Sequence, residues 1–113
     1  MNSLPIDRLV LLTLSDSQSG PLMKQLSRED FRFTLINSTG GIVQEAFICL
    51  LIGFSHERMP LFLDIVRSNC HAFRRYIPAQ GVVSVENPAM PMMEAQMGGA
   101  TVFMMNVERF EQI

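Results

Sequence analysis

Two pairs of neighbouring side chains in this sequence have the residue types that catalysis uses. Cys70 and His71 are adjacent, and a thiol beside an imidazole is the composition of a nucleophilic pair. Adjacent side chains diverge in an extended segment, however, and no third catalytic group accompanies this pair. His56 and Glu57 have the composition of a helix start rather than of a general acid and base. These residues therefore favour a protein that is not an enzyme.

A cluster of methionines offers a different chemistry, which is metal binding. Four of the nine methionines lie close together in the chain, namely Met90, Met92, Met93 and Met97. Soft thioether ligands suit Cu(I), so a copper-binding loop is the alternative hypothesis for this chain. Methionine is also a flexible residue that fills gaps at adaptable interfaces, and no cysteine or histidine lies within the cluster. We therefore assign no metal ligand and expect no cofactor.

The composition indicates one folded domain over residues 1–113. Of the 113 residues, 48% are hydrophobic and 18% are charged, which gives the chain ample apolar surface to bury. Nine lysines and arginines against eleven acidic residues leave a net charge of −2 and no basic stripe, so nucleic acid is not an expected partner. With so few charges, we expect some apolar surface to remain for a partner chain to cover.

The sequence also indicates where the protein resides. Its two cysteines form no CxxC motif, as expected in a reducing cytoplasm. The first residues lack the charged-then-apolar layout of a signal peptide. The longest apolar run, Ala46–Phe54, has nine residues, far fewer than the ~20 that a helix needs to cross a bilayer. We expect a cytoplasmic protein without membrane insertion.

The hydrophobic pattern predicts where strands and helices lie. Helices are expected after the caps at Ser15–Ser17, up to about Glu29, and after Ser55. The predicted strands are Asp7–Leu14, Phe31–Asn37, Ala46–Phe54, Gly99–Val107 and a short one at His71–Pro78. A long loop is expected at Ala79–Met97, because proline, glycine and methionine are frequent there, and loops of this length are usually functional or mobile.

This order of elements predicts an α+β fold. Strand, helix, strand, strand, helix, strand is the split pattern of a ferredoxin-like βαββαβ sandwich, with a four-stranded antiparallel sheet and two helices on one face. The strands are too apolar for the other face to stay in water, so we expect that face to meet further copies of the chain. Met104, in the last strand, is expected to point into this contact.

Several short motifs resemble those of the PII-like cyclic-di-AMP receptor family. The most specific is GGATVF at Gly98–Phe103, followed by Val107–Gln112. The other motifs, with similar spacing over nearly the whole chain, are Phe31–Thr34, Ser38–Gly41 and Gly53. The resemblance implies a trimeric, ferredoxin-like signal-transduction protein without enzymatic activity. In such a trimer the three sheets would pack inward, and ligands would bind at the clefts between subunits.

The resemblance also implies how such a protein signals. A cyclic adenine dinucleotide would bind, and two loops, at about Ile42–Glu45 and Ala79–Met97, would move and be read by a downstream protein that the sequence does not name. A trimer that binds no ligand is the remaining alternative.

Carried over position by position, the resemblance implies a set of ligand-binding residues. The family pattern is matched here at Arg32, Thr34, Gly41, Gly53, Phe103 and Gln112. An arginine can hold a phosphate with two hydrogen bonds, and the backbone N–H groups at Gly40 and Gly41 can approach an anion closely. Phe103 can stack on a base, and Gln112 can read an adenine edge with both a donor and an acceptor.

Three positions depart from the family pattern. Asp30 and Phe47 stand where the family has asparagine, and Ile42 stands where it has phenylalanine. Asp30 would repel a phosphate, whereas Phe47 and Ile42 would remove an amide and an aromatic ring from the ligand's surroundings. We therefore expect cyclic-di-AMP, or a related nucleotide, to bind more weakly than is typical of the family.

Overall fold

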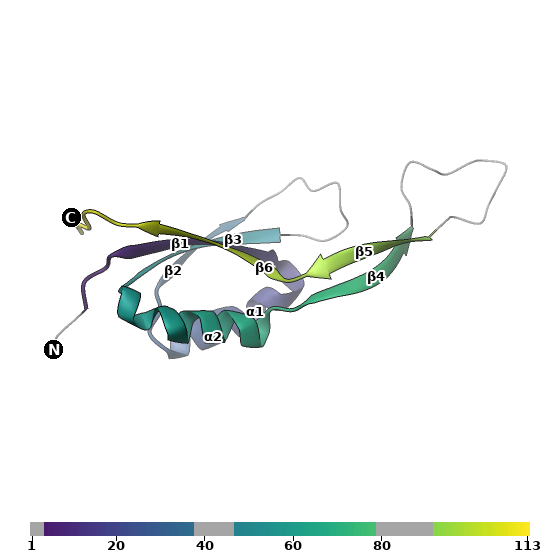
Figure 1. Ribbon diagram of the computed structural model, residues 1–113, viewed down its shortest axis with the longest axis horizontal. Coiled ribbons are helices and arrows are strands. Elements are labelled where there is room, and N and C mark those ends of the chain that lie inside the picture. The colour runs from purple at the N-terminus through teal and green to yellow at the C-terminus, as the bar shows by residue number, and fades with distance from the viewer. Residues whose placement is uncertain (1–3, 38–46, 79–91) are drawn as a thin grey trace.

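A computed structural model describes residues 4–37, 47–78 and 92–113 of the chain. Figure 1 shows how the elements follow one another. Within these residues they are β1 (Arg8–Ser15), η1 (Asp16–Gln18), α1 (Ser19–Arg28), β2 (Phe33–Asn37), β3 (Phe47–Phe54), η2 (His56–Arg58), α2 (Met59–Asn69), β4 (Ala72–Pro78), β5 (Met92–Gly98) and β6 (Ala100–Asn106), where η denotes a short 3-10 helix.

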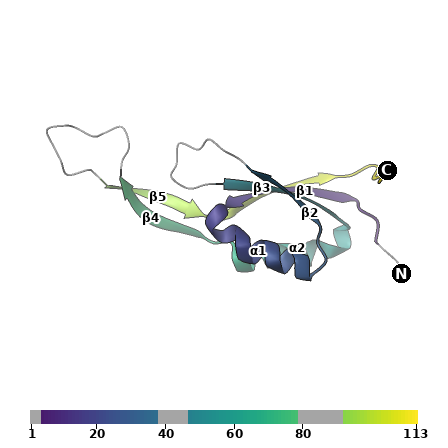
Figure 2. The ribbon, with the colours of Figure 1, turned by 180° about the vertical axis from the view of Figure 1, so that it is seen from behind.

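Four of the strands form one sheet in the order β2-β3-β1-β6, and every neighbouring pair is antiparallel. Both α-helices pack against the same face of this sheet, as the two opposite views show (Figures 1 and 2). β4 and β5 form a separate antiparallel hairpin that extends beyond the helices. The predicted α+β fold, with a four-stranded antiparallel sheet and two helices, is confirmed.

Strand alternation accounts for the core. Every second residue of β1 and β3 points toward the helices, and the register places these residues opposite one another. Leu12, for example, pairs with Leu50, and neither side chain is exposed to solvent. The buried hydrophobic residues contributed by these two strands and by the helices are Val10, Leu12, Leu14, Leu22, Leu26, Ile48, Leu50, Ile52, Phe54, Phe62, Ile65 and Val66.

The two helices begin in different ways. Before α2, the Ser55 hydroxyl oxygen accepts a hydrogen bond from the Glu57 N–H at 3.4 Å, and Pro60 lies in the first turn, where its missing N–H costs nothing. Gln18 stands at the N-cap of α1, and its side chain makes no capping hydrogen bond. The longer helix, α2, has 11 residues, so no helix in the described part of the chain has the length and apolar character of a membrane span.

The prediction of a loop at Ala79–Met97 is wrong for the last residues of that range. Met92–Gly98 forms β5, which pairs with β4 from Ala72↔Gly98 to Pro78↔Met92. This segment contains no β-branched or aromatic residue, and its extended form comes from the partner strand rather than from local preference. Residues 79–91 lie outside the described residues, so the rest of that prediction stays untested.

The other face of the four-stranded sheet carries no helix in the described part of the chain (Figures 1 and 2). Val10 points toward the helices and pairs with Met104, so Met104 lies on the helix side of β6. The prediction that Met104 points into a contact between chains is therefore wrong by one residue. Its neighbours Phe103 and Met105, which are 52% and 43% exposed, lie on the open face.

Candidate functional site

One row of residues crosses the open face of the sheet and contains two of the predicted ligand residues. Thr34 in β2 pairs with Leu51 in β3, Leu51 pairs with Leu11 in β1, and Leu11 pairs with Phe103 in β6. Thr34 and Phe103 thus share a face but lie on the two outer strands. Three strand spacings separate them, about 14 Å. Within one chain they cannot line a single small pocket.

Arg32 stands directly before β2 and is exposed. Its neighbour Phe31 is only 3% exposed and packs edge-on against Phe54 and Phe62, with ring centroids 5.4 and 5.9 Å away. This aromatic cluster fixes the backbone beside Arg32, while the guanidinium has no hydrogen-bond or ion-pair partner among the described residues. A free, anchored arginine of this kind can accept an anionic ligand without first breaking an ion pair.

Asp30 occupies a strained backbone position at the end of α1. Its φ is +61°, in the left-handed region. The Phe31 N–H donates to the Leu26 carbonyl at 2.9 Å, and the Asp30 N–H donates to the Ser27 carbonyl at 3.1 Å, which together form a Schellman motif. Glycine and asparagine are favoured at this position of the motif, and aspartate is tolerated less well. The asparagine expected here from the family pattern thus has a backbone reason besides any contact with a ligand.

Arg58, the last residue of η2, covers the same end of α1. Its guanidinium donates to the carbonyl oxygens of Glu29 and Asp30. The guanidinium carbon also lies 3.9 Å from the centre of the Phe31 ring, a cation–π contact. Arg58 therefore satisfies carbonyl groups that the end of α1 leaves without helical partners, and it holds the turn that leads to Arg32.

Gly53 lies in β3, one residue after the Ile52 that pairs with Phe33, and is therefore close to Arg32. A Cβ atom at this position would be 3.2 Å from the Cγ2 atom of Ile6, so the glycine leaves room for that side chain. In this chain Gly53 has a packing role, and Arg32, Thr34 and Gly53 together form one edge of the open face.

The remaining predicted residues lie elsewhere. Phe47 begins β3, pairs with Ser15 and is 40% exposed. It is six residues from Gly53 along the strand, about 20 Å away. Gln112 is exposed in the segment that follows β6. Gly40, Gly41 and Ile42 lie outside the described residues.

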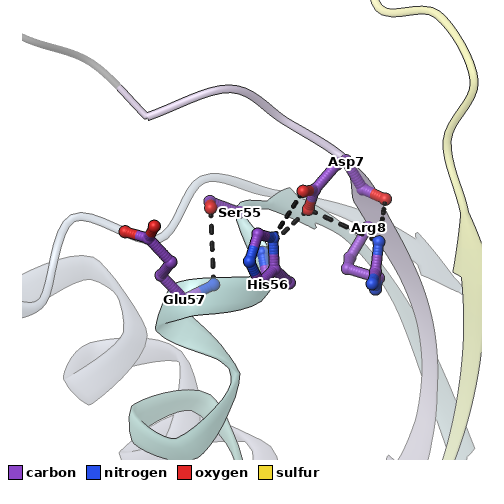
Figure 3. A network of polar contacts seen from close by, with 5 residues as sticks. All are labelled: Asp7, Arg8, Ser55, His56 and Glu57. Carbon is purple, nitrogen blue, oxygen red and sulfur yellow. Dashed lines mark hydrogen bonds and ion pairs between the residues drawn. The ribbon is translucent and has the colours of Figure 1, made fainter.

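Sequence reasoning missed a polar network that holds the start of β1 (Figure 3). The Asp7 carboxylate accepts a hydrogen bond from the His56 backbone N–H at 2.8 Å and lies 2.6 Å from His56 Nδ1. The hydrogen bond from the His56 side chain lowers the pKa of Asp7 below its ordinary value, although desolvation opposes this effect. The Asp7 carbonyl also accepts from the Val107 N–H at 3.0 Å, so the same residue anchors the segment that carries Gln112.

The structure bears on the proposed catalytic cysteine and on the arrangement of the methionines. Burial raises the pKa of the half-buried Cys70 thiol, which makes it a weaker nucleophile at neutral pH. No three histidine, cysteine or acidic side chains of the described residues are grouped to hold a metal ion. Met92, Met93 and Met97 belong to a strand rather than a loop, and Met97 is only 6% exposed. The prediction that the methionines lie in a loop is therefore wrong for these three, and Met90 lies outside the described residues.

Comparison with known proteins decides the family. Residues 7–113 match the sequence profile of the cyclic-di-AMP receptors. The chain belongs to the cyclic-di-AMP receptor family. A solved structure with the same fold is that of a functionally unknown protein from Pediococcus pentosaceus ATCC 25745, with a TM-score of 0.69 and 27% sequence identity over 96% of this chain and 98% of that chain. The resemblance that the motifs indicated is confirmed.

Cyclic-di-AMP receptors are a family of signalling proteins rather than enzymes. In this chain the predicted ligand-binding residues lie on opposite edges of the four-stranded sheet. Arg32, Thr34 and Gly53 lie at the β2 edge of the open face, while Phe103 lies at the β6 edge. Such a division is invisible in the sequence, because it depends on which strands become the outer ones.

Proposed function

We propose that this chain forms a homotrimer that binds cyclic-di-AMP in the cleft between two copies. The observation that carries the proposal is the division of the ligand residues between opposite edges of the open face, about 14 Å apart. A second copy whose β6 edge meets the β2 edge of the first brings Phe103 close to Arg32 and Thr34. The exposed apolar residues of the face would be covered in the same assembly.

Each residue of this shared cleft has a distinct task. Arg32 pairs with a phosphate, and the Thr34 hydroxyl on the same edge adds a hydrogen bond. The N–H groups at Gly40 and Gly41 approach the second phosphate or the ribose. Phe103, 52% exposed in one chain, offers its ring to an adenine. Gln112 reads the edge of that base, so residues from both copies complete the site.

The proposal extends to signalling. Binding would change the position of the two segments at about Ile42–Glu45 and 79–91, and a downstream protein would read that change. A cytoplasmic location fits, because both cysteines are free, as a reducing compartment requires.

Calorimetric titration with cyclic-di-AMP tests the proposal. Arg32→Ala is expected to weaken binding about ten- to hundredfold, because a phosphate loses its charged hydrogen bonds. Arg67→Ala, which removes the same charge from an exposed position on α2, is the matched control and is expected to bind like the natural protein. Equal binding by both variants, or no binding of any cyclic dinucleotide by the natural protein, would leave the open face as an assembly surface only.

The departures from the family pattern allow a second titration. Asp30→Asn and Phe47→Asn, made singly and together, are expected to increase the affinity, because they remove a negative charge and restore an amide. Asp30 is two residues from Arg32, whereas Phe47 lies at the far end of β3. The larger gain is therefore expected from Asp30→Asn, and a double variant without any gain would show that these positions do not set the affinity.

A further inference from the structure

The β4–β5 hairpin is joined to the rest of the fold at two places. The chain enters the hairpin at His71, between α2 and β4, and leaves it at Gly99, between β5 and β6. These two residues are hydrogen-bonded to each other, because the Gly99 N–H donates to the His71 carbonyl at 2.9 Å. From these two connections the hairpin extends away from the four-stranded sheet and the helices (Figures 1 and 2).

A single side chain, that of Gln18, bonds to both connections. Its Nε2 group donates to the His71 carbonyl at 2.9 Å. Its Oε1 atom accepts from the His71 N–H at 3.3 Å and from the Gly99 N–H at 3.1 Å. The primary amide of glutamine carries a donor and an acceptor on one group, so it can bond to the backbone as a neighbouring strand would. We call this arrangement of Gln18, His71 and Gly99 the Gln18 junction.

Two glycines make the Gln18 junction possible. Gly98 and Gly99 have φ angles of +69° and +79°, in the left-handed region. A Cβ atom on Gly98 would lie 2.3 Å from the His71 carbonyl oxygen and 2.9 Å from Gln18 Nε2. Any side chain at Gly98 would therefore push the connections and Gln18 apart. The same glycines have wide backbone freedom once the hydrogen bonds are released, so they can act as a hinge.

Gln18 directly precedes α1, yet its side chain bonds to the connections of the hairpin rather than to the helix. It is the N-cap residue of α1, where a side chain normally bonds to the free N–H groups of the first helical turn. Gln18 makes no such bond, and its amide reaches 53 residues along the chain to His71 instead.

We propose that Gln18 is a positioning residue that sets the direction of the β4–β5 hairpin relative to the four-stranded sheet. The hairpin is a separate sheet with few contacts to the core, and isolated hairpins are held weakly by their own hydrogen bonds. With the Gln18 junction formed, the hairpin has one direction. With the junction released, the hinge at Gly98 and Gly99 allows many directions. This inference does not depend on the identity of a ligand.

The test measures the direction of the hairpin by pulsed electron–electron resonance. Spin labels are placed at Tyr76→Cys on β4 and Lys24→Cys on α1, both exposed positions, in a background in which the two natural cysteines are replaced by alanine. Labelled chains are diluted with unlabelled ones, so that only distances within one chain are observed. Melting temperature and circular dichroism establish that each variant is folded.

Gln18→Ala is expected to broaden the distance distribution. It is also expected to speed amide exchange at least about tenfold at His71 and Gly99, while exchange in β1 and β3 stays unchanged. The matched control is Gln25→Ala in α1, which removes a 2.8 Å hydrogen bond from Asn69 in α2 and is expected to leave the distribution narrow. Gln18→Glu keeps the acceptor atoms and loses the donor, so its distance distribution is expected to be of intermediate width. If Gln18→Ala does not fold, Gln18→Glu provides the test.

Two results would overturn the inference. One is a folded Gln18 variant with the natural distance distribution, which would mean that other contacts direct the hairpin. The other is equal broadening by Gln25→Ala, which would mean that any loosening of α1 has the same effect.

Discussion

Both faces of the four-stranded sheet carry large apolar residues, but only one face is covered by helices of the described part of the chain. Leu50 and Leu51 are neighbours in β3, yet Leu50 is fully buried beneath the helices and Leu51, on the open face, is only partly buried. Ile36 and Phe103, also on the open face, are 42% and 52% exposed. An apolar strand residue thus indicates that something must cover it, but not whether the covering group belongs to the same chain.

Substitution of the two adjacent leucines, Leu50 and Leu51, gives the most direct comparison of the two faces of the sheet. Leu50→Ala is expected to lower the free energy of unfolding by about 2–5 kcal/mol at any protein concentration, because it leaves a cavity in the core. Leu51→Ala is expected to cost about 1 kcal/mol in the isolated chain and more as the protein concentration rises, because the proposed assembly would stabilise the natural protein. Urea unfolding at several concentrations measures both. Equal, concentration-independent losses would show that the open face has no partner.

A second pair tests the two faces of β6. Phe103→Glu places a charge on the open face and is expected to dissociate the assembly, because a buried unpaired charge is very costly. Met104→Glu places the same charge on the helix side at an edge position that is 45% exposed, so the assembly is expected to persist. Light scattering should give about three times the 12.8 kDa chain mass for the natural protein and for Met104→Glu, and about one chain mass for Phe103→Glu. The reverse pattern would contradict the register argument.

The network at the start of β1 predicts a dependence of stability on pH. The pKa of Asp7 is lowered in the folded protein from an ordinary value of 3.8. The stabilisation from its ionised form is therefore fully present above about pH 4 and is lost as the pH falls through the lower folded value. Thermal unfolding from pH 7 to pH 2 should show that Asp7→Asn is less stable than the natural protein at pH 7, and that the difference shrinks in acid. Asp64→Asn, on the exposed side of α2, is the control, and a difference that stays constant with pH would contradict this account.

The smallest effect is expected at the turn after α1. Asp30→Gly should raise the free energy of unfolding by about 1 kcal/mol or less, because glycine adopts a φ of +61° without steric cost. Asp30→Ala removes the same carboxylate but keeps the Cβ atom, so it should not be stabilising. Chemical unfolding of the two variants separates the backbone effect from the charge effect, and equal gains would assign the benefit to charge alone.

Much of the fold could be predicted because its signals are local. The apolar run in β3, the caps before α2 and the motifs at Phe31–Thr34 and Gly98–Phe103 each lie within a few residues of one another. β5 was missed because its partner β4 lies more than ten residues away, and the extended form of Met92–Gly98 comes from that pairing. Gln18 was missed as well, because its partners lie 53 and 81 residues further along the chain.

The residues of the candidate site were selected from short motifs, which carry no information on how those residues are arranged in space. Arg32, Thr34 and Phe103 were chosen from their motifs, and their roles as ligand residues stay a prediction. Their separation onto two edges could not be read from the motifs, because strand order is a property of the sheet. The left-handed position of Asp30 and the contact between Gly53 and Ile6 were hidden for the same reason, since each is set by neighbours in space.

The residue types and the spacing of the apolar residues were therefore sufficient to predict the α+β class and most strand and helix positions, and the motifs were sufficient to indicate the family. These features depend on short-range conformational preferences and on which side chains avoid water. The folded structure was needed to establish that Met104 faces the helices and Phe103 does not, because a shift of one residue in pairing exchanges the two faces of a strand. It was also needed to show that one glutamine holds both connections of the hairpin, since hydrogen bonds between distant segments exist only once the chain has folded.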